Sequence, residues 1–97
     1  MYARVTFATA QSGKTEEIAK VIRDSVLPAL KKQKGFNGLL HMGDRKTGKG
    51  MNIALWDSEA DMTAGETSGF YREQVAKVVP LLAGATTMEH YEVTLQG

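Results

Sequence analysis

Cysteine is absent from the chain, and its absence removes several kinds of protein chemistry at once. The chain can form no disulfides, no thiolate metal sites and no thiol nucleophile. Histidine is scarce as well, because His41 and His90 are the only imidazoles. No third potential metal ligand lies at a recognisable spacing from these two histidines, so the sequence predicts no metal site.

The chain also lacks a strong net charge and a long apolar run. Twelve basic residues against eleven acidic ones leave a formal charge of +1, which argues against electrostatic binding to nucleic acid or to a membrane surface. No apolar run approaches the roughly 20 residues of a membrane span, and the N-terminus has no basic-then-apolar signal pattern. We therefore expect a cytoplasmic protein that binds neither nucleic acid nor membrane.

The residues that are present describe an ordinary globular chain. Its 97 residues are 42% hydrophobic and 24% charged, without a low-complexity tract, and this length predicts a single domain over residues 1–97. A chain of this size hides only about 60 to 70% of its unfolded surface. A large private cavity is therefore difficult to build, and a partner subunit would help.

Four stretches have the pattern of β-strands. Residues 2–9 alternate apolar and polar side chains with a period of two. Residues 36–42 and 51–56 stand on either side of a polar, glycine-rich connector, which predicts a hairpin. Residues 86–95 predict a final strand.

Helical patterns fill the two intervals between these strands. Apolar side chains at steps of three and four predict a helix from residue 15, with a kink or break near Leu27 caused by Pro28. Residues 58–66 and 70–82 predict a second helical region, interrupted around Gly69. Asp57 or Ser58 is expected to cap its start.

The order strand, helix, hairpin, helix, strand predicts an α+β fold of the ferredoxin-like β-α-β-β-α-β type. Its sheet would have four antiparallel strands and helices on one face. The strands are apolar on both faces, as in residues 51–56, where Ile53 and Leu55 alternate with Ala54 and Trp56. Because two helices cover only one face, we expect a homodimer packed sheet to sheet.

One motif in the chain imitates a phosphate-binding loop. Residues 8–15, ATAQSGKT, follow a strand and open a helix, but Ala8 replaces the first glycine of a P-loop. Such loops require a mostly parallel sheet with crossover helices. We interpret the segment as a tight turn followed by a helix start.

A few polar and aromatic residues are candidates for a site. His41 and His90 are the natural proton acceptors near neutral pH, or they are strand histidines that are simply hydrogen-bonded or solvated. Trp56 either lines a ligand pocket or anchors the strand-to-helix corner. Tyr71 follows the interruption at Gly69, where a helix break can form the mouth of a pocket. Asn52 points to the same side of its strand as Trp56 and either orients a ligand or faces the hairpin.

Several short motifs resemble those of a known superfamily. They are SGKTEE at residues 12–17, GFNG at 35–38, LWDSEAD at 55–61 and MEHYEV at 88–93. Together they span nearly the whole chain and are similar to segments of the dimeric α/β-barrel proteins grouped with antibiotic biosynthesis monooxygenases. This resemblance implies a ferredoxin-like fold that pairs into a dimeric α/β barrel.

The resemblance also implies a range of functions. Members include cofactor-independent monooxygenases of polycyclic phenols, haem-degrading enzymes, quinol oxygenases and many proteins without an assigned reaction. By approximate alignment, the Asn, Trp and His of the haem-degrading branch fall on Thr6, Gly65 and Val75. Haem degradation is therefore not expected.

The sequence leaves three functions in competition. The first is a cofactor-free monooxygenase that oxidises a small aromatic or phenolic substrate with O2 in a pocket between sheet and helices. The second is a non-catalytic domain, binding a small hydrophobic ligand or acting in stress response. The third is a purely structural dimer without a vacant pocket. In the enzyme, the expected base is His41 or His90, and the expected substrate-binding residues are Arg4, Asn52, Trp56 and Tyr71.

Overall fold

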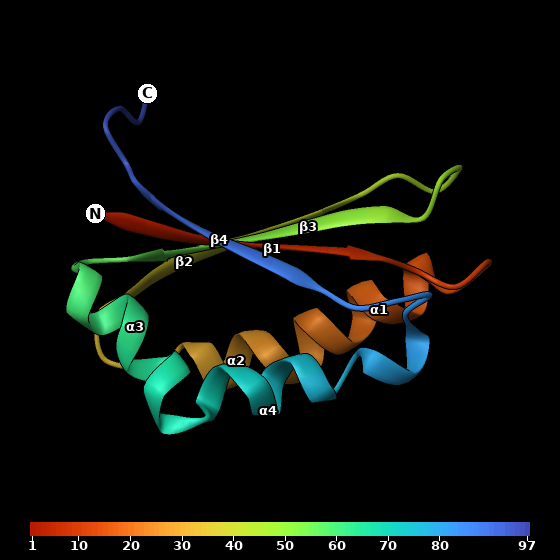
Figure 1. Cartoon of the computed structure of the whole chain (residues 1–97), viewed down its shortest axis with the longest axis horizontal. Coiled ribbons are helices and arrows are strands. Elements are labelled where there is room, and N and C mark those ends of the chain that lie inside the picture. Colours follow the sequence, from red (N-terminus) through yellow and green to blue (C-terminus); the bar gives the residue numbers. More distant parts are fainter.

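The chain folds into a four-stranded sheet with all of its helices on one face (Figure 1). The computed structural model describes all 97 residues. Its elements are β1 (Tyr2–Thr9), α1 (Thr15–Val21), a π-helical segment (Ile22–Val26), α2 (Leu27–Leu30), β2 (Phe36–Gly43), β3 (Lys49–Trp56), α3 (Glu59–Ser68), α4 (Phe70–Ala76), a 3-10 turn (Val79–Leu81) and β4 (Thr87–Glu92).

The sheet has the strand order β2-β3-β1-β4, and every neighbouring pair is antiparallel. This confirms the predicted ferredoxin-like fold. The register places Arg4 of β1 opposite Ala54 on one side and opposite His90 on the other, and it places His41 opposite Asn52. Side chains alternate between the faces of a sheet, so these register partners share the face that the helices cover.

The strand-to-helix corner after β3 forms as expected. Ser58 caps α3, because its side chain accepts a hydrogen bond from the Asp61 amide at 3.1 Å. Gly69 then ends α3 with a φ of 89°, in the left-handed region that glycine adopts at little cost. This turn separates α3 from α4, and it confirms the interruption predicted there.

Several boundaries differ from the prediction. The helix is irregular near Leu27 as expected, but it does not break there. It widens into the π-helical segment, where the Leu27 amide donates to the Ile22 carbonyl, and this accommodates Pro28, which has no amide to donate. The helix expected over 70–82 ends at Ala76, because Pro80 disfavours α-helical backbone before it. The last strand stops at Glu92, opposite Tyr2, because its partner β1 begins there.

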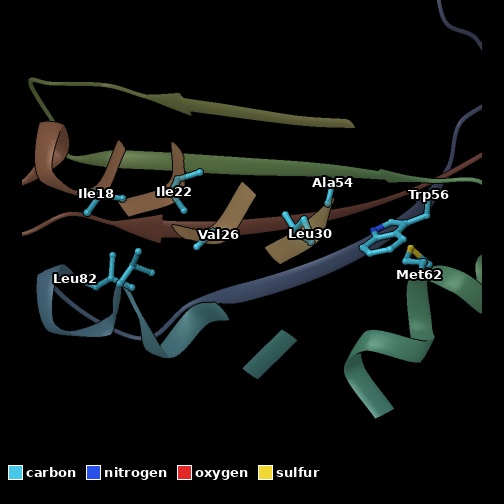
Figure 2. Close-up of a cluster of buried hydrophobic side chains, with 9 residues drawn as sticks. Ile18, Ile22, Val26, Leu30, Ala54, Trp56, Met62 and Leu82 are labelled. Carbon is cyan, nitrogen blue, oxygen red and sulfur yellow. The ribbon is translucent and has the colours of Figure 1, made fainter. Parts of the chain in front are cut away.

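The hydrophobic core lies between the sheet and the helices (Figure 2). Helical residues at every fourth position face the strands, and the cluster comprises Ile18, Ile22, Val26, Leu30, Ala54, Trp56, Met62, Val78 and Leu82. Trp56 and Met62 lie together at one end, and each is only 1% exposed. None of the helices combines the length and the apolar composition that a membrane span requires.

Candidate active site

A cavity of about 90 Å³ lies between the sheet and the helices, several times the roughly 10–15 Å³ that one water molecule requires. Apolar side chains of the helical layer form much of its wall, among them Ile18, Ile22, Val26, Leu30, Val78 and Leu82. Polar side chains also contribute, among them Arg4, Thr6, His41, Asn52, Tyr71 and Gln74. An apolar space with a few polar groups has the composition of a small-molecule site, and its volume is smaller than the roughly 300–1,000 Å³ of typical ligand pockets.

His41 and Asn52 form one polar pair in this wall. They face each other across β2 and β3, and His41 Nδ1 lies 2.6 Å from Asn52 Oδ1. With the amide oxygen toward the ring, Nδ1 carries the proton and donates it to Asn52. The lone pair of a neutral His41 is then on Nε2, so the asparagine fixes which ring nitrogen can accept a proton.

Thr6 and Tyr71 form a second polar pair. Thr6 Oγ1 and the Tyr71 hydroxyl are 2.8 Å apart, and this hydrogen bond connects β1 to α4. Tyr71 is brought over the sheet because Gly69 turns the chain sharply between α3 and α4. The phenol hydroxyl therefore reaches a cavity whose floor is the sheet.

Arg4 is the buried charged group of the cavity wall, and it is only 3% exposed. Its guanidinium lies 4.4 Å from the Tyr71 ring centroid and 5.3 Å from that of Trp56. Nη1 donates to the Met62 carbonyl at 3.0 Å and to Glu66 Oε2 at 3.3 Å. Burial lowers the pKa of Arg4 from the usual arginine value, and Glu66 partly offsets this.

The guanidinium of Arg4 has donors to spare. Both of its hydrogen bonds to protein use Nη1, so Nε and Nη2 have no protein partner. A guanidinium offers five N–H donors in a planar fork that suits an anionic or carbonyl oxygen. The wall of the cavity thus presents a buried cation with free donors.

The two histidines lie in different places. His41 lines the cavity, whereas His90 lines a separate and more open hollow together with Tyr2, Glu59 and Glu92. His90 Nε2 is 2.7 Å from Glu66 Oε2. A base acting inside the cavity is therefore His41 on geometric grounds, and His90 reaches the cavity only through other side chains.

Trp56 lies outside the cavity wall. It packs edge-to-face on Phe36, with ring centroids 5.6 Å apart, and it supports the guanidinium of Arg4. Its indole nitrogen is buried without a hydrogen-bond partner. This arrangement matches the structural alternative considered for Trp56, in which it anchors the corner.

Sequence reasoning missed three residues near the cavity: Thr6, Glu66 and Gln74. Thr6 shares the period-two face of Arg4 and could have been found from that pattern alone. Glu66 and Gln74 could not, because their contribution depends on where α3 and α4 lie over the sheet. Gln74 is buried in the cavity wall, and its Oε1 accepts a hydrogen bond from Lys77 Nζ at 2.7 Å.

No protein-family model matches the sequence, and no curated protein matches it. Solved structures do match. SnoaB, a cofactor-independent oxygenase from Streptomyces nogalater, is 14% identical, with a TM-score of 0.77 over 98% of this chain and 94% of that one. A provisionally named antibiotic biosynthesis monooxygenase from Bordetella bronchiseptica is 14% identical, with a TM-score of 0.80 over 97% of both chains.

A third solved structure contains a ligand. The monooxygenase from the gene ActVA-Orf6 of Streptomyces coelicolor, in complex with Nanaomycin D, is 16% identical, with a TM-score of 0.72 over 99% of this chain and 92% of that one. The chain therefore has the fold of the antibiotic biosynthesis monooxygenase structures, as its sequence motifs implied. Likeness at this level of identity establishes the fold, and activity has to be argued from the site.

Proposed function

We propose that the chain is a cofactor-independent monooxygenase that oxidises a small aromatic or phenolic substrate with O2 in the cavity between sheet and helices. The observation that carries this proposal is the cavity itself, in which the His41–Asn52 pair and the spare donors of Arg4 share an otherwise largely apolar wall. The fold shared with SnoaB, described as a cofactor-independent oxygenase, supports it.

The residues of the wall would divide the work between binding and proton removal. The apolar side chains bind the aromatic rings and exclude water. Arg4 and Tyr71 hold the substrate oxygen, and Arg4 stabilises the negative charge that develops there when a proton leaves. His41, held by Asn52, accepts that proton on Nε2.

The reaction needs no electrons from outside the substrate. Deprotonation of an activated CH2 or phenol gives an electron-rich anion, which reduces O2 and forms a carbon–oxygen bond. Loss of the second proton from the same carbon and cleavage of the oxygen–oxygen bond then give a carbonyl and water. The sum is CH2 + O2 → C=O + H2O, in which the substrate supplies the four electrons that O2 accepts.

Oxygen uptake with anthrone tests the proposal. We expect the protein to consume one O2 for each anthraquinone formed, faster than anthrone oxidises in buffer alone, and to place one labelled atom from ¹⁸O2 in the product. If anthrone binds in the cavity but oxygen uptake is no faster than in buffer, the proposed monooxygenase activity is contradicted. It would favour the alternative, a domain that binds small hydrophobic ligands.

We also propose that the protein acts as a homodimer through the open face of the sheet, forming the dimeric α/β barrel. Leu39 and His41 face the cavity, so Leu40 and Met42 of the same strand face the opposite side. Leu40 is 56% exposed and Met42 is 46% exposed, with Tyr91 of β4 at 52%. An exposed apolar sheet face with no helix over it is suited to a second copy of itself.

Leu40→Lys is expected to weaken this dimer at least about tenfold, because it buries an unpaired charge in an apolar interface. Sedimentation equilibrium should show a monomer at concentrations where the unchanged protein is a dimer. Val79→Lys is the matched control, since Val79 is 53% exposed but lies in the helical layer. A monomeric unchanged protein, or equal weakening by both substitutions, would contradict the proposed interface.

A further inference from the structure

A short chain of polar contacts connects the buried guanidinium of Arg4 to the surface. Arg4 Nη1 lies 3.3 Å from Glu66 Oε2, and His90 Nε2 lies 2.7 Å from the same oxygen. Exposure rises along the chain, with the side chain of Arg4 at 3%, that of Glu66 at 21% and that of His90 at 37%. One carboxylate oxygen is thus shared by a donor in the cavity wall and a donor at the surface.

The fold fixes this arrangement. Arg4 and His90 are register partners on β1 and β4, so their backbones lie side by side and their side chains emerge on the same face. Glu66 comes from α3, which crosses this end of the sheet. The other hydrogen-bond partner of Arg4 is the Met62 carbonyl, which is neutral. Glu66 is therefore the only carboxylate that neutralises the guanidinium.

We propose that His90 is a positioning residue for Arg4, acting through Glu66, and that it couples anion binding in the cavity to the protonation of a surface imidazole. A carboxylate only accepts hydrogen bonds, so Nε2 of His90 donates to Glu66 in both protonation states. Protonation of His90 changes the net charge of the three groups. The charges of Arg4 and Glu66 cancel while His90 is neutral, and the net charge of the three side chains is +1 when His90 is protonated.

The direction of the coupling follows from this charge. A protonated His90 strengthens its own hydrogen bond to Glu66 and competes with Arg4 for the shared oxygen. The guanidinium is then less neutralised, and it attracts an anionic oxygen in the cavity more strongly. Anionic ligands are therefore bound more tightly when His90 is charged.

The other ionisable groups around His90 do not produce this change. Glu66 and Glu59 approach it from α3, Arg4 and Tyr2 from β1, and Tyr91 and Glu92 from its own strand. The hydrogen bond to Glu89 raises the pKa of Tyr91 above its usual value. Imidazole is the side chain that ordinarily changes charge between pH 5 and 8, and the chain has only one other, His41.

The inference rests on the proposed use of Arg4 as the ligand anchor, and 2-naphthoate is a suitable probe because it stays anionic throughout the pH range. In His41→Gln, which leaves His90 as the only imidazole, we expect the Kd from calorimetry to be about fivefold lower near pH 5.5 than near pH 8, because Glu66 then neutralises the guanidinium less completely and the Coulomb attraction between Arg4 and the anion rises. Adding His90→Gln should remove this dependence. Persistence of the full dependence in the double variant would overturn the proposal.

Glu66→Gln separates positioning from simple attraction by His90. In His41→Gln/Glu66→Gln the imidazole of His90 remains but the shared carboxylate is gone, so the preference for low pH should vanish. An unchanged pH dependence in that variant would show that His90 acts directly and would overturn the role given to Glu66. Circular dichroism would establish that each variant is folded.

The emission of Trp56 provides a readout that needs no ligand. Trp56 is the only tryptophan, and Arg4 lies over its ring, so movement of the guanidinium alters its fluorescence. In ligand-free His41→Gln the emission should change between about pH 5.5 and 8, and it should be flat once His90→Gln or Glu66→Gln is added. Naphthoate that binds at neither pH would contradict the proposed function, and the emission would still decide the coupling: a flat titration in His41→Gln overturns it.

Discussion

His41→Ala is expected to lower kcat for anthrone oxidation by about 10² to 10⁴, the range that a positioned general base contributes. The structure places this imidazole in the cavity wall and orients it through Asn52. The apolar wall and Arg4 would still bind the substrate, so KM should change much less than kcat. Initial rates of oxygen uptake measured over a range of anthrone concentrations separate the two parameters.

His90→Ala is the matched control for this prediction, because the chain has no other histidine. His90 lies outside the cavity and touches it only through Glu66, so its removal should lower kcat less than about tenfold, a change of roughly 1.4 kcal/mol in the barrier. A larger loss of kcat in His90→Ala than in His41→Ala would reverse the assignment of the base. Equal rates in His41→Ala and the unchanged protein would leave the reaction without a histidine base.

The fold could be predicted from the sequence because its signals are local. The period-two alternation of residues 2–9, the glycine-rich hairpin connector and the cap at Ser58 each specify one element without reference to the rest. The errors lie where an element depends on a partner or on hydrogen-bond spacing. The last strand ends at Glu92 because β1 begins at Tyr2, and no residue after Glu92 indicates this.

The site could be predicted only in part, for a related reason. Alternation along the strands places Arg4, Asn52 and His41 on one face of the sheet, and the structure brings all three to the cavity together with Tyr71. The alternation does not indicate which part of that face each helix covers. His90 shares the face with Arg4, but it lies at the edge strand, where it meets Glu66 and not the cavity. The catalytic and binding roles of these residues stay predictions.

Trp56→Ala is expected to lower the free energy of unfolding by about 3 to 5 kcal/mol, the usual cost of removing a large aromatic side chain from a core. Trp56 is 1% exposed and contacts the ring of Phe36 and the guanidinium of Arg4. Small domains are stabilised by only about 5 to 15 kcal/mol in total, so this loss should greatly lower the urea concentration at the midpoint of unfolding. Circular dichroism at a fixed protein concentration measures it without relying on the missing indole.

Trp56→Phe should be far milder, at about 1 kcal/mol, because two effects oppose each other. Phenylalanine is smaller and loses packing, but it also removes the indole N–H, which is buried without a partner and costs about 1 to 3 kcal/mol when left unpaired. A phenyl ring also keeps an aromatic face for Arg4. Equal destabilisation by the two substitutions would mean that the indole N–H is hydrogen-bonded in solution, and that Trp56 has a polar role beyond anchoring the strand-to-helix corner.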